Sequence, residues 1–313
     1  MRKKVTIVGA GNVGATAAQW IAARDLADVI LIDIVEGLPQ GKALDLAESG
    51  PVEGFNINIT GTNNYADTAN SDVCIITAGV PRRKNPETGE YPSRDELVQT
   101  NQKIVGNVVR SFVEYSPNAI LIIVSNPLDA MCHVALEESG FPPERVIGQA
   151  GALDTARYKT FLSMELGVSV KDIHGIVLGG HGDTMVPLPN HTSVAGIPVL
   201  ELLERERLDE IITRTRKGGG EIVGLLGYSG YYAPASASVS MVEAIVKDQK
   251  RVIPSAVYLQ GQYGYENLYI GAPCVLGAGG VERVIEMKLS DEEKEMLEVS
   301  ANAVRGVVDV LGY

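Results

Sequence analysis

The sequence predicts an α/β protein in which a doubly wound parallel sheet is followed by a mixed α+β domain. Short, almost wholly apolar runs alternate with helix-length segments over the first half of the chain, and a glycine-rich turn follows the first of these runs. The length of 313 residues favours two domains, which we place at residues 1–145 and 146–313.

Four apolar runs in the first half have the length of strands, at residues 5–8, 29–32, 73–77 and 120–124. Runs of this kind are typical of strands that are buried on both faces of a parallel sheet. Helices are expected between them, at residues 11–24, 38–49 and 95–115. The alternation predicts a parallel sheet that is covered by helices on both faces.

The pattern changes after residue 148. A helix is expected at residues 153–166, a buried apolar run at 173–178, a long polar helix at 207–226, and strand-like runs later. Ser290 and Glu293 form a capping-box pattern at the start of a final surface helix that reaches residue 310. Because no long linker separates the two halves, we expect an extensive interface, with the active site in the cleft between them.

The composition excludes several classes of protein. Asp and Glu number 39 against 27 Lys and Arg, and the net charge of -12 argues against nucleic acid or an acidic membrane as a partner. Cys74, Cys132 and Cys274 are widely spaced, which favours a reducing, cytoplasmic location. No stretch has the composition of a membrane span, and no two histidines have zinc-motif spacing, so we expect no metal.

A dinucleotide site is predicted at the first glycine-rich turn, Gly9-Ala10-Gly11-Asn12-Val13-Gly14. The first glycine permits the tight turn, the second lets the backbone approach a pyrophosphate, and the third allows close helix packing. Asp33 ends the second apolar run, 19 residues after the last glycine, where a carboxylate binds the adenosine ribose and repels a 2′-phosphate. This spacing predicts a Rossmann-type domain that binds NAD rather than NADP.

Candidates for the chemistry are His181 and the pair Asp154 and Arg157. His181 lies in a glycine-rich turn just past the apolar run 173–178, and loops at strand ends often carry function. Asp154 and Arg157 are three residues apart, on one face of the expected helix. The residues alone favour a structural histidine at 181 and a local ion pair between Asp154 and Arg157.

Taken together, these segments resemble the family of NAD-dependent lactate and malate dehydrogenases. The similarity runs along essentially the whole chain, from Gly9 through the segments 126–129, 153–157 and 180–183. Residues 217–223 are similar to the malate dehydrogenases that are built like lactate dehydrogenases. The resemblance implies that the active site lies where these segments meet.

The resemblance assigns a role to each candidate. It implies that His181 donates and accepts the proton at the substrate oxygen, that Asp154 holds the other ring nitrogen, and that Arg157 binds the C1 carboxylate. It also implies that Asn126 contacts the nicotinamide ribose and the substrate hydroxyl. Further contacts to the cofactor are implied for Asn101 and Val124.

Residues 80–96 form a loop rich in Pro, Gly and charged side chains, which ends at a helix start with Ser93 as the expected N-cap. We interpret it as a mobile lid, and its composition fits a solvated surface loop equally well. By resemblance, Arg94 polarises the C2 carbonyl on closure, as a catalytic and substrate-binding residue, and Arg82 binds the second carboxylate of a four-carbon diacid. The loop is longer than is usual in the family, which leaves three alternatives to Arg82: Arg83, Lys84 and Tyr91.

The resemblance implies an enzyme of the tricarboxylic acid cycle that interconverts (S)-malate and oxaloacetate with NAD. A monocarboxylate would leave Arg82 buried without a partner, so malate is expected over lactate. Two alternatives stay open: a lactate or broad 2-hydroxy acid dehydrogenase, because of the lengthened loop, and a non-catalytic NAD-binding protein. The resemblance also suggests a homo-oligomer, either a tetramer or a dimer.

Overall fold

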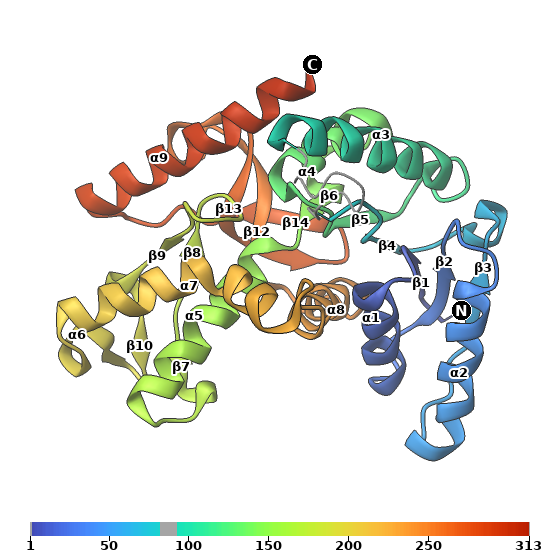
Figure 1. Ribbon diagram of the computed structural model, residues 1–313, viewed down its shortest axis with the longest axis horizontal. Coiled ribbons are helices and arrows are strands. Elements are labelled where there is room, and N and C mark those ends of the chain that lie inside the picture. The colour runs from blue at the N-terminus through green and yellow to red at the C-terminus, as the bar shows by residue number, and fades with distance from the viewer. Residues whose placement is uncertain (1, 82–92, 313) are drawn as a thin grey trace.

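The computed structural model describes residues 2–81 and 93–312. Its centre is a sheet of nine strands with helices packed on both faces (Figure 1). Six of these strands run parallel in the order β6-β5-β4-β1-β2-β3. Their bounds are β1 Lys4–Val8, β2 Asp28–Ile32, β3 Ile59–Thr62, β4 Val73–Ile76, β5 Ile120–Ile123 and β6 Val146–Gly148.

This strand order confirms the predicted doubly wound sheet. The chain moves outward from β1 to β3 on one side and from β4 to β6 on the other, so the order reverses between β1 and β4. In open α/β sheets, ligands bind beyond the carboxyl ends of the strands at this reversal. The glycine-rich turn that follows β1 lies at that point.

Three antiparallel strands extend the same sheet beyond β6. They are β12 Arg251–Gln260, β13 Glu266–Gly277 and β14 Gly280–Val284. Strand β12 joins the parallel part by pairing with β6, where Ala256 lies opposite Gly148. A Cβ on Gly148 would come within 2.5–2.7 Å of Leu128, Ala256 and Cys132, so only glycine fits at this junction. Through this pairing of β6 with β12, one sheet includes strands from both predicted halves of the chain, 1–145 and 146–313.

Helices cover the two faces of the sheet in separate groups (Figure 1). Helices α1 and α8 pack together on one face, and α3, α4 and α9 cover the other. Helix α2 lies against the edge strand β3, and α5 packs against α7 in the second half. The bounds are α1 Asn12–Ala23, α2 Leu38–Glu53, α3 Arg94–Val113, α4 Leu128–Ser139, α5 Ala150–Leu166, α6 Val199–Leu202, α7 Arg205–Leu226, α8 Tyr232–Val246 and α9 Asp291–Val308.

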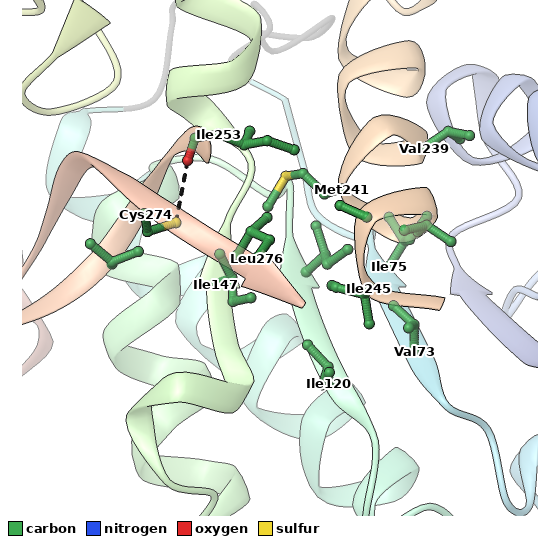
Figure 2. Close-up of a cluster of buried hydrophobic side chains, with 14 of the residues drawn as sticks. Val73, Ile75, Ile120, Ile147, Val239, Met241, Ile245, Ile253, Cys274 and Leu276 are labelled. Carbon is green, nitrogen blue, oxygen red and sulfur yellow. Dashed lines mark hydrogen bonds between the residues drawn. The ribbon is translucent and has the colours of Figure 1, made fainter. Parts of the chain in front are cut away.

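The core explains why the central strands β4 and β5 are apolar at every position. Val73 and Ile75 of β4 face the layer that contains α1 and α8, whereas Cys74 and Ile76 face the layer that contains α3 and α4. All four side chains are fully buried. Figure 2 shows the first layer around Ile75, where side chains from β4, β5, β6, α8, β12 and β13 meet.

The predicted run 173–178 is the one strand expectation that the structure corrects. It is broken into β7 Ile173–His174 and β8 Val177–Leu178. The halves separate because β7 pairs with β10 Ser193–Val194, whereas β8 pairs with β9 Val186–Pro187. Strand β11 Ile197–Pro198 completes the small sheet on β10.

Local signals at two helix starts are confirmed. Ser93 accepts a hydrogen bond from the Glu96 N–H, and its own N–H donates to the Glu96 carboxylate. Ser290 and Glu293 form the same capping box on α9.

Strand β3 and helix α4 were not predicted. In the part of the chain that the structure describes, no helix combines the length and the apolar character that crossing a bilayer requires.

Candidate active site

The turn between β1 and α1 has the geometry that its three glycines predict. Gly9 has a φ of +107°, and a Cβ there would lie 2.4 Å from the Thr77 Oγ1. A Cβ on Gly14 would lie 1.9 Å from the Gly9 carbonyl oxygen, so this glycine allows the helix to pack against the turn. Around Gly11, the described residues leave the space within 4 Å of such a Cβ open. The turn can therefore bring its backbone close to a pyrophosphate.

Asp33 lies at the end of β2, directly beside this turn. Its Oδ2 accepts a hydrogen bond from the Ala10 N–H at 2.7 Å, and its Oδ1 accepts one from the Val35 N–H at 3.0 Å. The carboxylate is half-buried and fixed at the position expected for a ribose-binding acid. The residues present thus fit an NAD molecule, with the pyrophosphate at the start of α1 and the adenosine ribose at Asp33.

Asn101 connects two segments at the carboxyl edge of the sheet. Its buried side chain accepts from the Val80 N–H at 2.7 Å, and donates to the Val80 carbonyl at 3.0 Å and to the Asn126 carbonyl at 2.7 Å. Asn126 follows β5 with an exposed side chain, and the Val124 N–H is bound by the Ile76 carbonyl at 2.9 Å. These contacts bring Asn101 and Asn126 together at the carboxyl ends of β4 and β5, where Val124 also lies, while their cofactor contacts stay predictions.

The structure brings Asp154, Arg157 and His181 together in one cluster, in which Asp154 is buried and the other two are half-buried. Asp154 Oδ2 lies 2.9 Å from the His181 Nδ1, and Asp154 Oδ1 lies 3.4 Å from the Arg157 Nη1. Both Asp154 and Arg157 come from α5, where the three-residue spacing puts them on one face. His181 reaches them from the turn after β8. A single carboxylate thus anchors both a proton carrier and a guanidinium that can bind an anion.

The pKa of His181 is raised above its ordinary value. Burial alone would lower this pKa, but the charge and the hydrogen bond of Asp154 favour the imidazolium, and the charge of Asp129 adds to them. The Arg157 guanidinium acts in the opposite direction. A histidine with these neighbours keeps its proton to higher pH than a free imidazole and can transfer it to a substrate oxygen.

Gly218 of α7 is a site residue that the sequence analysis did not identify. A Cβ on Gly218 would lie 2.5 Å from the Cδ and 2.9 Å from the Nε of Arg157. The Arg157 side chain crosses the helix there and donates to the Thr215 carbonyl at 3.4 Å. The segment 217–223 was identified only by its resemblance to a family, and its local pattern contains no signal for this contact.

The predicted lid falls largely outside the described residues. Arg82 and its alternatives lie there, and of Arg94 only the backbone, at the first residue of α3, lies within them. The roles of Arg82 and Arg94 therefore stay predictions.

The fold and the geometry together define a class: an NAD-dependent oxidoreductase with a Rossmann-type domain and a histidine and aspartate couple. Residues 3–148 match the model of the lactate/malate dehydrogenase NAD binding domain, and residues 151–309 match that of the alpha/beta C-terminal domain. The chain belongs to the lactate/malate dehydrogenase family.

Full-length relatives are closely similar. A malate dehydrogenase of Roseiflexus castenholzii is 56% identical over 312 residues, which cover 99% of each chain. The structure of malate dehydrogenase from Salinibacter ruber superposes with a TM-score of 0.94 at 52% identity, covering 99% of this chain and 97% of that one. The structure of a lactate dehydrogenase from Cryptosporidium parvum, solved with lactic acid and NAD, also superposes with a TM-score of 0.94. It is 39% identical to this chain, and the match covers 100% of this chain and 98% of that one.

Proposed function

We propose that this protein interconverts (S)-malate and oxaloacetate with NAD as the cofactor. The observation that carries the proposal is Asp154, whose two carboxylate oxygens contact His181 and Arg157. The cluster can bind the C1 carboxylate of a 2-keto acid at Arg157 while His181 meets the oxygen on C2. The malate dehydrogenases that are more than half identical to this chain support a dicarboxylate as the substrate.

The protein residues carry the proton and orient the substrate. NADH held at the glycine-rich turn and Asp33 would supply the hydride for the reduction of C2 of oxaloacetate. His181 donates its proton to the oxygen on C2, and accepts the proton from malate in the opposite direction. Asp154 binds the Nδ1 side of the ring, which leaves Nε2 for the substrate, and its negative charge stabilises the imidazolium. Arg157 holds the C1 carboxylate by charge-assisted hydrogen bonds.

The choice between malate and lactate depends on a partner for the second carboxylate, for which we propose Arg82. The test is NADH oxidation with oxaloacetate and with pyruvate, in the parent protein and in Arg82→Gln. We expect the parent to prefer oxaloacetate, and the variant to lose about a hundredfold in kcat/KM for oxaloacetate with little change for pyruvate. Arg83→Gln and Lys84→Gln are matched controls that remove one charge each from the same loop.

Three outcomes would contradict this proposal in different ways. A parent protein that prefers pyruvate would establish the 2-hydroxy acid alternative, for which the length of the loop is the motivating feature. Activity with neither substrate would favour a non-catalytic NAD-binding protein. A loss of oxaloacetate activity in the Arg83 or Lys84 variant instead would move the second carboxylate to that residue.

We also propose that the protein acts in the cytoplasm, in the tricarboxylic acid cycle, and assembles as a homo-oligomer, either a tetramer or a dimer. Support for assembly comes from exposed apolar side chains of α2 and of the turn before it, including Ile34 and, in the helix, Leu44 at 61% exposure. Sedimentation that detects only a species of 33.4 kDa would contradict the oligomer.

A further inference from the structure

The turn that carries His181 is held by side chains from helices far away in the sequence. The Gly179 N–H and carbonyl both pair with Gly271 of β13, at 2.9 and 3.0 Å. The Gly180 N–H donates to the Ser300 Oγ of α9 at 2.8 Å, and the His181 N–H donates to the Asp129 Oδ2 of α4 at 2.8 Å. Three consecutive backbone N–H groups of this turn thus each have an acceptor on a different element.

Asp129 is unusual among these acceptors because it is charged and buried. Only 7% of the residue is exposed, and its Oδ1 has no hydrogen-bond partner within the described part of the chain. Burial raises the pKa of this carboxyl to about 6, against the opposing effect of the His181 N–H and the His181 ring. Burying a carboxylate in this way costs free energy. Ser300 shows that a neutral side chain can hold an N–H of the same turn.

We propose that Asp129 is a positioning residue for the reaction, which fixes the backbone of His181 and adds a second negative charge, besides that of Asp154, close to the imidazole. The inference rests on the proposed function, in which His181 transfers the proton. Asp129 has no contact with the substrate in this scheme and acts only through His181.

The negative charge of Asp129 can change the pKa of the titratable groups that lie around it. His181 and Asp154 influence its carboxyl, and the Cys132 thiol lies one turn further along α4. The Arg157 guanidinium lies on the far side of Asp154 and opposes both carboxylates at His181. Because Asp129 favours the imidazolium, removing its charge is expected to lower the pKa of His181.

Three variants separate the charge from the hydrogen bond. Asp129→Asn keeps an oxygen acceptor for the His181 N–H and removes the charge, and Asp129→Ala removes both. Ser300→Ala is the matched control, because it removes the neighbouring hydrogen bond to Gly180 without any change in charge. NADH binding, measured by fluorescence titration, checks in each variant that the dinucleotide domain is folded.

The first measurement is an NMR titration of the His181 ring in the cofactor-free protein, which does not depend on turnover. We expect the midpoint to move to lower pH in Asp129→Asn and to stay unchanged in Ser300→Ala. An unchanged midpoint in Asp129→Asn, or an equal movement in Ser300→Ala, would overturn the proposed effect of the charge.

The second measurement is the pH profile of kcat/KM for oxaloacetate reduction, which requires protonated His181. In Asp129→Asn, the fall of kcat/KM at high pH is expected to begin at a lower pH, because the charge that favours protonated His181 is gone. The maximal kcat/KM is expected to stay within about threefold of the parent, because the acceptor for the His181 N–H is kept. Asp129→Ala is expected to lose about tenfold to a hundredfold at every pH, because the turn is no longer fixed. An alanine variant that binds NADH and keeps full kcat/KM would refute the positioning role.

The two measurements distinguish failure of this inference from failure of the proposed function. A parent protein that reduces neither oxaloacetate nor pyruvate would overturn the function, while the NMR titration would still test whether Asp129 sets the pKa of His181. An active parent whose variants match it in midpoint and profile would overturn the inference alone.

Discussion

Replacement of Gly218 by alanine is expected to weaken substrate binding while leaving α7 intact. The added Cβ would lie 2.5 Å from the Arg157 Cδ and 2.9 Å from its Nε, which is closer than van der Waals contact allows. Arg157 has little freedom to move away, because its side chain is 13% exposed and is bound to Asp154 and to the Thr215 carbonyl. The guanidinium must therefore shift from the position in which it would bind the C1 carboxylate.

The size of the effect follows from the interaction that is displaced. A hydrogen bond to a charged group contributes about 1.5–3 kcal/mol, so its loss is expected to lower kcat/KM for oxaloacetate about tenfold to a hundredfold. The free energy of unfolding should not fall. Alanine is favoured over glycine in a helix interior by about 1 kcal/mol, which offsets the strain at Arg157.

Gly220→Ala is the matched control for this prediction. It lies two residues further along the same helix, and nothing in the described residues lies within 4 Å of the added Cβ. It is expected to raise the midpoint of thermal unfolding by about 2 °C and to leave the kinetics unchanged. The assays are steady-state NADH oxidation and a thermal melt of each variant. If Gly218→Ala has the same KM and kcat as Gly220→Ala, the reasoning about Arg157 is wrong.

Three other predictions concern the cofactor site, a helix start and the buried acid. Asp33→Asn keeps the acceptor for Ala10 but removes the negative charge, so the preference for NADH over NADPH in kcat/KM should fall about tenfold, and an unchanged ratio would contradict the assignment. Ser290→Ala breaks the capping box of α9 and should lower the free energy of urea unfolding by about 1 kcal/mol, without an effect on KM. The pKa of Asp129 rises from 3.8 to about 6 on folding, so the native protein binds more protons and becomes less stable as pH rises through this window. Relative to Asp129→Asn, the parent should lose about 2 kcal/mol between pH 4 and pH 7, and parallel stability curves would count against a buried carboxyl of raised pKa.

Local patterns in the sequence were sufficient for the elements that bind the cofactor. Strands that are buried on both faces must be apolar at every position, so Val73 to Ile76 could be located without any knowledge of their neighbours. The separate roles of Gly9, Gly11 and Gly14 follow from backbone geometry within one turn, and the structure shows the contacts that each glycine allows or avoids. Capping boxes were equally predictable, because their two partners are three residues apart.

Elements whose existence depends on pairing were less predictable. The run 173–178 has the composition of one strand, but its two halves pair with different partners, so the chain divides between them. Strand β3 contains two threonines and a glycine and is stabilised by its pairing with β2 at the edge of the sheet. In both cases the structure is decided by pairing with another segment, which the pattern of the segment itself does not specify.

The sequence by itself determined the doubly wound sheet, the dinucleotide turn with Asp33, and, through its resemblance to a family, which residues are candidates for the chemistry. Only the tertiary structure decided how they meet. Asp154 and His181 are 27 residues apart in the chain, and His181 and Asp129 are 52 apart. Contacts of this kind depend on how helices dock against a common sheet, whereas periodicity and capping reflect interactions within a few residues. For that reason Gly218, Ser300 and the buried charge of Asp129 emerged only once the chain was folded.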